Sequence, residues 1–458
     1  MRAGRPRRGA PSEDPSHDRD FFGPLRSSNP LAPLYLLMLA FDTGEGALRF
    51  LMPVFVRELG QPYTIVGTMT AVFGLTTLLT RLPTGLAYRA HRARLLLVVA
   101  GLGCSVSFML LAFTSSLPLV AFLIAIDGVG WGVVTTVLLS LMLANRPPRT
   151  TSAAAMGWFV GINGLGHALA ALIGGFLADA IGIRAAFLAL GAVPLLATLL
   201  MGRVLAGHGG AEQPLTVDLS AGASEPGSAS DGSTHAEGRA RAIGRPSVAG
   251  LGAALRRSVR VPTVVWTAAF VSFYANTMNS LLVSFFPLLA LTLGMSLSQA
   301  GTLSAIRSGT SALTRFAAIP IIERVGERRL RTPTMIASAV ATTAVSLSPI
   351  FLLQAPIWAI NGLFRGILRV GTSTEAMSAV SDEDSGPTAA LLSGGLDLGK
   401  IVGPLVAGAV ADAIGVAGMF RVLPLGFLVV FLLLGTVERR RRLPARQVRD
   451  EPTDDPRS

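Results

Sequence analysis

Long apolar stretches, separated by short polar connections, run through most of this chain. Twelve of them are long enough to cross a bilayer as helices, with expected bounds 31–55, 63–87, 94–114, 117–143, 153–178, 185–203, 263–291, 297–322, 332–353, 356–379, 388–412 and 418–437. The pattern therefore predicts an all-α integral membrane protein with twelve transmembrane helices, and the lipid bilayer is its surroundings.

Composition supports the membrane assignment and removes one alternative. Only 14% of the 458 residues are charged and 51% are hydrophobic, whereas about one quarter of a soluble protein is charged. The net charge of +12 could suit a nucleic-acid binder. The arginines, however, cluster at the ends of spans and in one long connection, so we expect no nucleic-acid partner. A single cysteine, Cys104, excludes an intramolecular disulfide.

The positions of the arginines predict the orientation of the spans. Alternate connections and the last tail carry groups of them, namely Arg89, Arg92 and Arg94; Arg146 and Arg149; Arg324, Arg328, Arg329 and Arg331; and Arg439 to Arg442. The opposite side holds only Arg57 and Arg184, with Arg421 just inside the last span. Because positive connections stay inside the cell, both termini are expected in the cytoplasm, with the protein in the cell membrane (plasma or inner). The N-terminal segment lacks the pattern of a secretory signal.

One long polar segment divides the chain. Residues 204–262 are rich in Gly, Ala, Ser and Glu, a composition that cannot bury a core, so we expect a flexible cytoplasmic linker. The expected parts are a disordered tail at 1–30, six spans at 31–203, this linker, six spans at 263–437 and a second cytoplasmic tail at 438–458.

The two halves repeat in sequence. A gap-free shift of 234 residues aligns 42–81 with 276–315, and 12 of these 40 positions are identical. They include the pairs Gly60/Gly294, Gly67/Gly301, Pro53/Pro287 and Arg81/Arg315. A shift of 233 aligns Ala178-Asp-Ala-Ile-Gly182 with Ala411-Asp-Ala-Ile-Gly415. Such repeats are typical of transporters, whose substrate site lies between the repeats near the midplane.

Two six-span halves joined by a long cytoplasmic loop resemble the major facilitator superfamily, from about residue 31 to 437. The family's loop signature, Gly-x-x-x-Asp-Arg-x-Gly-Arg-Arg, has a recognisable second copy in Glu323-Arg-Val-Gly-Glu-Arg-Arg329. The first copy, Gly85-Leu-Ala-Tyr-Arg-Ala-His-Arg-Ala-Arg94, lacks the acid and the inner glycine. The resemblance implies two pseudo-symmetric six-helix bundles and a gating role for Glu323, Arg324 and Gly326.

The fifth and eleventh spans carry glycines that resemble a pattern of family antiporters. They are Gly166-His-Ala-Leu-Ala-Ala-Leu-Ile-Gly174-Gly175 and Gly399-x-x-x-Gly403-Pro404. Close packing through small residues explains the same glycines, so antiport and simple helix packing both remain open.

Ionisable residues lie deep inside several spans, where a charge is costly and indicates function. The first, fourth and fifth spans hold Asp42, Glu45, Arg49, Asp127 and His167; the eighth, tenth and eleventh hold Arg307, Arg365, Arg369, Glu375, Asp397 and Lys400. The interiors of the third, sixth, ninth and twelfth spans hold none. In the family these four face lipid, while the others line a central cavity.

The N-terminal half carries most of the acids. Asp42 and Glu45 share one helical face with Arg49, and we expect that face to line the cavity. Their repeat mates, and that of Asp127, are the amides Asn276, Asn279 and Asn361. A carboxylic acid can take up and release a proton and an amide cannot, so Asp42, Glu45 and Asp127 are candidate proton carriers. The alternative is that these acids only pair with Arg49 and other neighbours.

The C-terminal half carries most of the bases. Arg307, Arg365 and Arg369 are candidates to bind an anionic group through their planar guanidinium forks; the alternative is that they neutralise Glu375 or Asp397. Asn276, Asn361 and His167 complete the candidate substrate site with Asp397 and Lys400. Arg81 and Arg315, near the cytoplasmic ends of equivalent spans, are candidate gate contacts.

Lys400, the only lysine, lies in the middle of the eleventh span. It either pairs with Asp397, three residues earlier on the same helical face, or takes part in substrate binding and coupling.

These features predict a secondary transporter that moves a small organic solute by alternating access, coupled to protons, with export favoured. An uncoupled facilitator, an organic-anion importer and a non-transporting membrane sensor or scaffold are the alternatives. A nucleotide-binding Gly-x-x-x-x-Gly-Lys-Ser loop is absent from the sequence. We expect no enzyme activity, no cofactor, no metal and a monomer, and the sequence leaves the substrate open.

Overall fold

The computed structural model describes residues 31–145, 152–205, 263–378 and 385–447. All regular elements in this part of the chain are helices, as the sequence predicts. The tail at 1–30 and nearly all of the expected linker lie outside the described residues, as does the end of the last tail.

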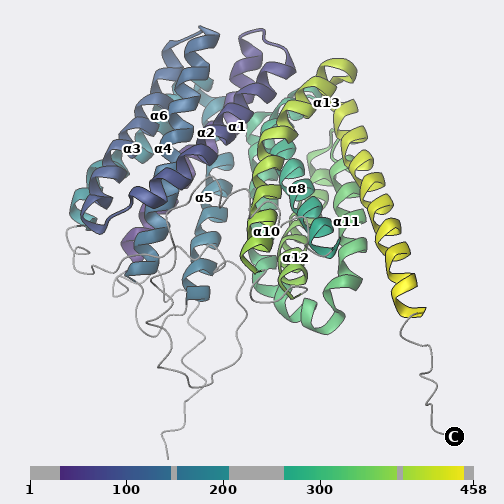
Figure 1. The fold of residues 1–458 in the computed structure, drawn as a ribbon. Helices are drawn as coiled ribbons and strands as arrows, with labels where there is room; N and C mark the ends of the chain where they lie inside the picture. Colours follow the sequence, from purple (N-terminus) through teal and green to yellow (C-terminus); the bar gives the residue numbers. More distant parts are fainter. Residues whose placement is uncertain (1–30, 146–151, 206–262, 379–384, 448–458) are drawn as a thin grey trace, which may run out of the picture.

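The first half forms one bundle of six long helices, coloured purple to blue in Figure 1. The helices are α1 (Ala32–Glu58), α2 (Tyr63–Ala87), α3 (Ala90–Leu110), α4 (Leu117–Ala144), α5 (Ser152–Ile181) and α6 (Ile183–Leu205). A short 3-10 turn, Leu111–Phe113, continues α3.

The second half forms the other bundle, coloured teal to yellow in Figure 1. Its elements are α8 (Thr263–Ser284), α9 (Phe286–Thr292), α10 (Leu297–Val325), α11 (Glu327–Ala344), α12 (Phe351–Ser378) and α13 (Ser385–Gln447). Helices α8 and α9 meet at a bend of 46°. The long α13 is two helices that meet at Gly415, whose φ of 78° is not helical. Counting α8–α9 as one span and α13 as two gives the twelve spans that the sequence predicts.

Not every span is equally apolar. By length and composition alone, seven helices in the described ranges could cross a membrane, or eight if α8 and α9 form one span. α1 falls short, and it carries Asp42, Glu45 and Arg49 in its middle. Most of its residues are nevertheless buried, because α1 packs against α5 and α6.

The expected bounds of the ninth and tenth spans are wrong by several residues. The expected bounds, 332–353 and 356–379, place the break at 354–355, but α11 already ends at Ala344 and α12 begins at Phe351. Pro349 lies in the connection and Pro356 lies inside α12. A proline lacks the N–H that continues a helix, so either proline could have marked the break.

Glycines at the ends of helices follow the internal repeat. Gly60 and Gly294 have φ of 75° and 77°, and Gly182 and Gly415 have φ of 82° and 78°. These conformations suit glycine, because it has no Cβ. The repeat seen in sequence therefore turns the chain at equivalent places in both bundles.

Two helix crossings hold the bundles together at one end. α5 packs against α10, and α2 packs against the first part of α13, while α3, α6 and α11 pack mainly within their own bundles. At the first crossing a Cβ added to Gly301 would clash with the carbonyl oxygen of Ala171; at the second, one added to Gly67 would clash with that of Pro404. Small residues therefore allow the bundles to meet backbone to backbone. We call this end of the molecule the joined end.

Each crossing also carries a carboxylate that caps a helix of the opposite bundle. Asp179 of α5 accepts hydrogen bonds from the backbone N–H groups of Leu297 (3.2 Å) and Ser298 (2.7 Å), at the start of α10. Asp412 of α13 accepts them from Tyr63 (2.7 Å) and Thr64 (2.8 Å), at the start of α2. The first N–H groups of a helix lack partners within it, and a negative charge there is favourable. We call these two contacts the cross-bundle caps.

Candidate functional site

A cavity of about 350 Å³ lies between the bundles, within the size range of small-molecule sites. Polar and charged side chains from both bundles line it: Arg49, Arg81, Thr135, Asn163, His167, Asn276, Asn279, Ser304, Arg307, Ser308, Arg365, Ser393, Asp397 and Lys400. Apolar side chains such as Met38, Phe50, Trp131, Phe159 and Leu282 complete the wall. The sequence-predicted candidates thus come largely to one place.

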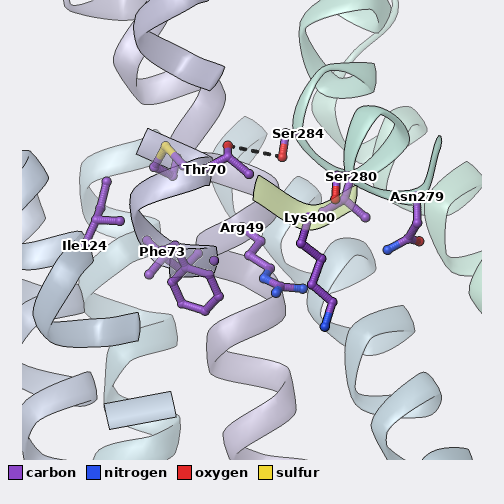
Figure 2. Close-up of a pocket in the computed structure, with 12 residues that line it drawn as sticks. Arg49, Thr70, Phe73, Ile124, Asn279, Ser280, Ser284 and Lys400 are labelled. Carbon is purple, nitrogen blue, oxygen red and sulfur yellow. Dashed lines mark hydrogen bonds between the residues drawn. The ribbon is translucent and has the colours of Figure 1, made fainter. Parts of the chain in front are cut away.

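A smaller pocket adjoins this cavity and shares Arg49, Asn279 and Lys400 with it. Figure 2 shows the side chains of Arg49 and Lys400 next to each other, with Asn279 facing the same space. Thr70 of α2 and Ser284 of α8 form a hydrogen bond of 3.4 Å at its edge. Both bundles therefore contribute to this pocket as well.

The acids of α1 belong to a network with α5. Glu45 pairs with Arg49 (2.5 Å, Oε1 to Nε) and with His167 (3.3 Å, Oε2 to Nε2). Asp42 accepts a hydrogen bond of 2.6 Å from the Asn163 amide, and its Oδ1 is 3.7 Å from His167 Nδ1. Two carboxylates, one imidazole and one guanidinium thus meet inside the first bundle.

His167 lies between the two carboxylates of this network. Its Nδ1 lies 2.8 Å from the backbone carbonyl oxygen of Asn163, and a carbonyl can only accept, so Nδ1 carries a proton. Nε2 then faces Glu45 in one of two ways. Either Nε2 also carries a proton and forms an ion pair with the carboxylate, or it is unprotonated and faces a neutral glutamic acid. The pair can thus hold its proton on either residue.

The acids themselves are deeper than we expected. Asp42 is 0% exposed and Glu45 is 6% exposed, and neither is among the residues that line the cavity. Their contacts Asn163, His167 and Arg49 do line it. The expectation that Asp42 and Glu45 face the cavity is therefore wrong for this conformation, because the α5 side chains packed on α1 occupy that wall.

Asp127 of α4 is also buried and does not line the cavity. Its Oδ2 has no hydrogen-bond partner among the described residues, and one oxygen of Asp42 is in the same situation. An uncompensated buried charge is costly. Such a carboxyl group is stabilised either by binding a proton or by a local change of conformation that gives its oxygen a partner.

The second bundle has a buried arginine in contact with the amide mates of Glu45 and Asp127. Arg307 of α10 is 3% exposed. Its Nε donates to Asn361 Oδ1 (2.8 Å) and its Nη2 to Asn279 Oδ1 (3.1 Å). The amide of Asn361 in turn donates to Thr342 Oγ1 at 2.9 Å. Arg307 thus ties α8, α10 and α12 together at the cavity wall.

The two bundles use equivalent positions for related contacts. Asn163 donates to Asp42 in the first bundle, and Asn276, the mate of Asp42, donates to the carbonyl oxygen of Leu396 (2.7 Å) in the second. Leu396 is itself the mate of Asn163 under the 233-residue shift. The same helix crossing therefore has a titratable group in one bundle and a neutral contact in the other.

Lys400 pairs with Asp397 as one of our two alternatives predicts, with 3.2 Å between Nζ and Oδ1. Arg81 of α2 approaches the same oxygen at 3.8 Å, so Asp397 connects the two bundles. Lys400 also lines both pockets. Pairing and a role in the site are therefore compatible.

The remaining candidates are less informative. Arg365 lines the cavity, with Ser311 Oγ 3.5 Å from its Nη1. Arg324 and Gly326 are exposed at the end of α10 and lie away from the cavity. The side chains of Arg315, Glu323 and Arg369 lie outside the described part of the structure.

Sequence reasoning missed Asn163 and both cross-bundle caps. The signal for the caps was present, because Asp179 and Asp412 are the aspartates of the repeated Ala-Asp-Ala-Ile-Gly segment.

The family model described as Major Facilitator Superfamily matches residues 34–296 and 265–454. Among curated proteins, "Multi-drug resistance efflux pump PmrA" from two strains of Streptococcus pneumoniae, TIGR4 and R6, is 28% identical over 158 residues. The match covers 33% of this chain and 39% of the pump, so it spans about two fifths of that relative's length.

Solved structures share the fold. A bacterial homologue of the human lysosomal transporter Spinster, inward-facing and unoccupied, aligns with a TM-score of 0.69 at 17% identity, over 90% of this chain and 96% of that one. The nucleoside transporter NupG aligns with a TM-score of 0.61 at 12% identity, over 90% of this chain and 98% of that one. With the family model matching nearly the whole chain, this multi-pass membrane protein belongs to the Major Facilitator Superfamily of transporters.

Proposed function

We propose that this protein is a proton-coupled secondary transporter that exports a small organic solute across the cell membrane by alternating access. The observation that carries the proposal is the close contact of Asp42, Glu45 and His167 behind one wall of the central cavity. Buried acids of this kind mark proton relays in membrane transporters. The partial match to an efflux pump supports the direction.

The orientation in the membrane is part of this proposal. The arginine-rich connections Arg89–Arg94 and Arg324–Arg331 lie at the end opposite the joined end. By the positive-inside rule the joined end faces outward and the termini face the cytoplasm. The cross-bundle caps and the glycine crossings then seal the outer side, and the structure represents an inward-facing state.

Coupling follows from where the proton can go. With Nδ1 of His167 held by a backbone carbonyl, loss of a proton leaves the His167–Glu45 pair as a neutral imidazole beside a carboxylate. Uptake of a proton from the cavity, by this pair or by another carboxylate, reverses that loss. Either change alters the charge of the wall that the solute meets. A solute whose binding depends on the charge of this wall is therefore coupled to proton movement as access alternates.

The experiment is substrate-induced proton movement in proteoliposomes that contain a pH-sensitive dye. A panel of organic anions, cations and neutral compounds is added, and an active compound should move protons across the membrane. Asp42→Asn and Glu45→Gln reproduce the polar shape of their mates Asn276 and Asn279 without a titratable group. We expect each to keep substrate binding and lose proton movement.

Three outcomes separate the alternatives. Solute movement with no proton movement in the unaltered protein would identify an uncoupled facilitator. Full coupling in the Asp42→Asn/Glu45→Gln double variant would place the proton site elsewhere. Absence of solute movement for every compound would favour a membrane sensor or scaffold.

A further inference from the structure

We propose that the transported solute carries an oxyanion group, such as a carboxylate, and that Arg307 binds it. This inference rests on the proposed function, because it takes the central cavity as the solute site. It concerns the chemistry of the solute, which proton coupling leaves open.

Among the residues that the structure describes, no carboxylate balances the charge of Arg307. Ion pairs in the described part of the chain engage Arg49 with Glu45, and both Arg81 and Lys400 with Asp397. Arg307 has no such pair there, although it is 97% buried and lines the cavity. A buried charge normally has a counter-ion, and the cavity is the place from which one can come.

The contacts of Arg307 orient it without neutralising it. Its two partners, Asn279 and Asn361, are the repeat mates of Glu45 and Asp127. Carboxylates at these positions would accept the same hydrogen bonds and would also cancel the charge. Amides accept the hydrogen bonds and leave the positive charge available to a bound group.

Donors remain for that group. The guanidinium has five N–H donors, and its hydrogen bonds to Asn361 and Asn279 use one on Nε and one on Nη2. The planar fork of N–H groups matches a carboxylate or a phosphate.

A purely structural role for Arg307 is the competing interpretation, since it joins three helices. Removing the arginine cannot separate the two, because the variant could misfold. Asn279→Asp can separate them. It keeps the side-chain shape and the hydrogen bond that Arg307 donates, and it adds the counter-charge found at Glu45. If Arg307 is only structural, the variant should be as stable as the unaltered protein or more stable. If Arg307 binds an anionic solute, the new carboxylate should neutralise it and weaken binding of that solute.

The test is equilibrium binding to the purified full-length protein, without a proton gradient. The probes share one ring system: naphthoate, naphthyl phosphate, naphthamide and naphthylmethylamine. We expect at least one oxyanion to bind more tightly than the amide and the amine, on the order of tenfold or more, as a charge-assisted hydrogen bond gives. Asn279→Asp should remove this preference.

Gln299→Glu is the matched control. It makes the same change of charge and shape outside the cavity, at the start of α10, where Gln299 Oε1 accepts from the Ser296 N–H. Glutamate serves equally well in that capping position. The oxyanion preference should therefore survive in this variant.

Each outcome decides the proposal. Equal or tighter binding of naphthamide or the amine overturns it, and so does failure of both oxyanions to bind at millimolar concentration. An oxyanion preference that persists in Asn279→Asp assigns Arg307 to structure. Oxyanion binding that moves no protons in proteoliposomes would contradict the proposed proton coupling and still support this inference. Proton-coupled transport of cations alone would support the coupling and contradict this inference.

Discussion

Replacing Asp179 and Asp412 with alanine tests how firmly the cross-bundle caps hold the joined end. Each alanine removes the acceptor for two backbone N–H groups at the start of a helix in the opposite bundle. Asp412 also accepts from the Thr64 hydroxyl at 2.5 Å. The bonds lie between the bundles, so they exist only while that end is closed, and their loss raises the free energy of the closed state alone.

The expected magnitude follows from helix capping. Loss of a capping side chain costs about 1 kcal/mol, and both aspartates are exposed, which keeps the value from being larger. One substitution should therefore shift the balance towards opening roughly fivefold, and both together roughly thirtyfold, at about 1.4 kcal/mol per factor of ten. The two sites share no contacts, so their effects should add.

The measurement is the distance distribution between spin labels at Glu58 and Thr292, in a protein whose native cysteine is removed. These residues end α1 and α9 at the joined end, one in each bundle, and both are exposed. The unaltered protein should give one short distance, and the double alanine variant should add a longer one. Asp412→Asn is the conservative control, because asparagine is also a good capping residue, and it should shift less than alanine. An unchanged distribution in the double alanine variant would mean that the caps do not hold this end.

Three further predictions concern other contacts. Gly67→Val places a side chain against the carbonyl oxygen of Pro404, so it should prevent closure of the joined end, seen as the longer distance in the same spin-label measurement. If Lys400 only balances Asp397, Asp397→Asn/Lys400→Gln should transport normally, whereas Lys400→Gln alone should be less stable than the double variant, because Asp397 keeps only its 3.8 Å contact with Arg81. If Lys400 belongs to the site, the double variant should fold, as judged by size-exclusion elution, and fail in the proteoliposome assay. A cysteine at Ser224 should react with an impermeant thiol reagent in everted vesicles and not in whole cells; the opposite labelling would reverse our orientation.

The helices and the repeat could be predicted from sequence because both depend on local patterns. Apolar length gives a span, and a glycine such as Gly60 or Gly415 marks a turn in whichever bundle it occurs. The pairing of acids with amide mates could also be predicted, since it needs only the alignment of the two halves.

Contacts between distant segments could not be predicted in the same way. Asp179 accepts a hydrogen bond from a backbone N–H 118 residues away. The pattern of side chains cannot predict this contact, because the partner is a backbone group. The depth of Asp42 and Glu45 depends on how α5 crosses α1, where a Cβ on Gly166 would clash with Asp42. The choice of Pro349 over Pro356 as the helix break depends on how α11 and α12 pack.

The cross-bundle caps make the joined end reciprocal, because each half supplies a carboxylate to the other and receives one in return. A contact of this form is isologous, the kind that joins two identical subunits about a two-fold axis. Here the axis relates two halves of a single polypeptide, so loss of one cap leaves the other cap intact. The two bundles would then separate first on the side of the lost cap, and their relative motion would become asymmetric.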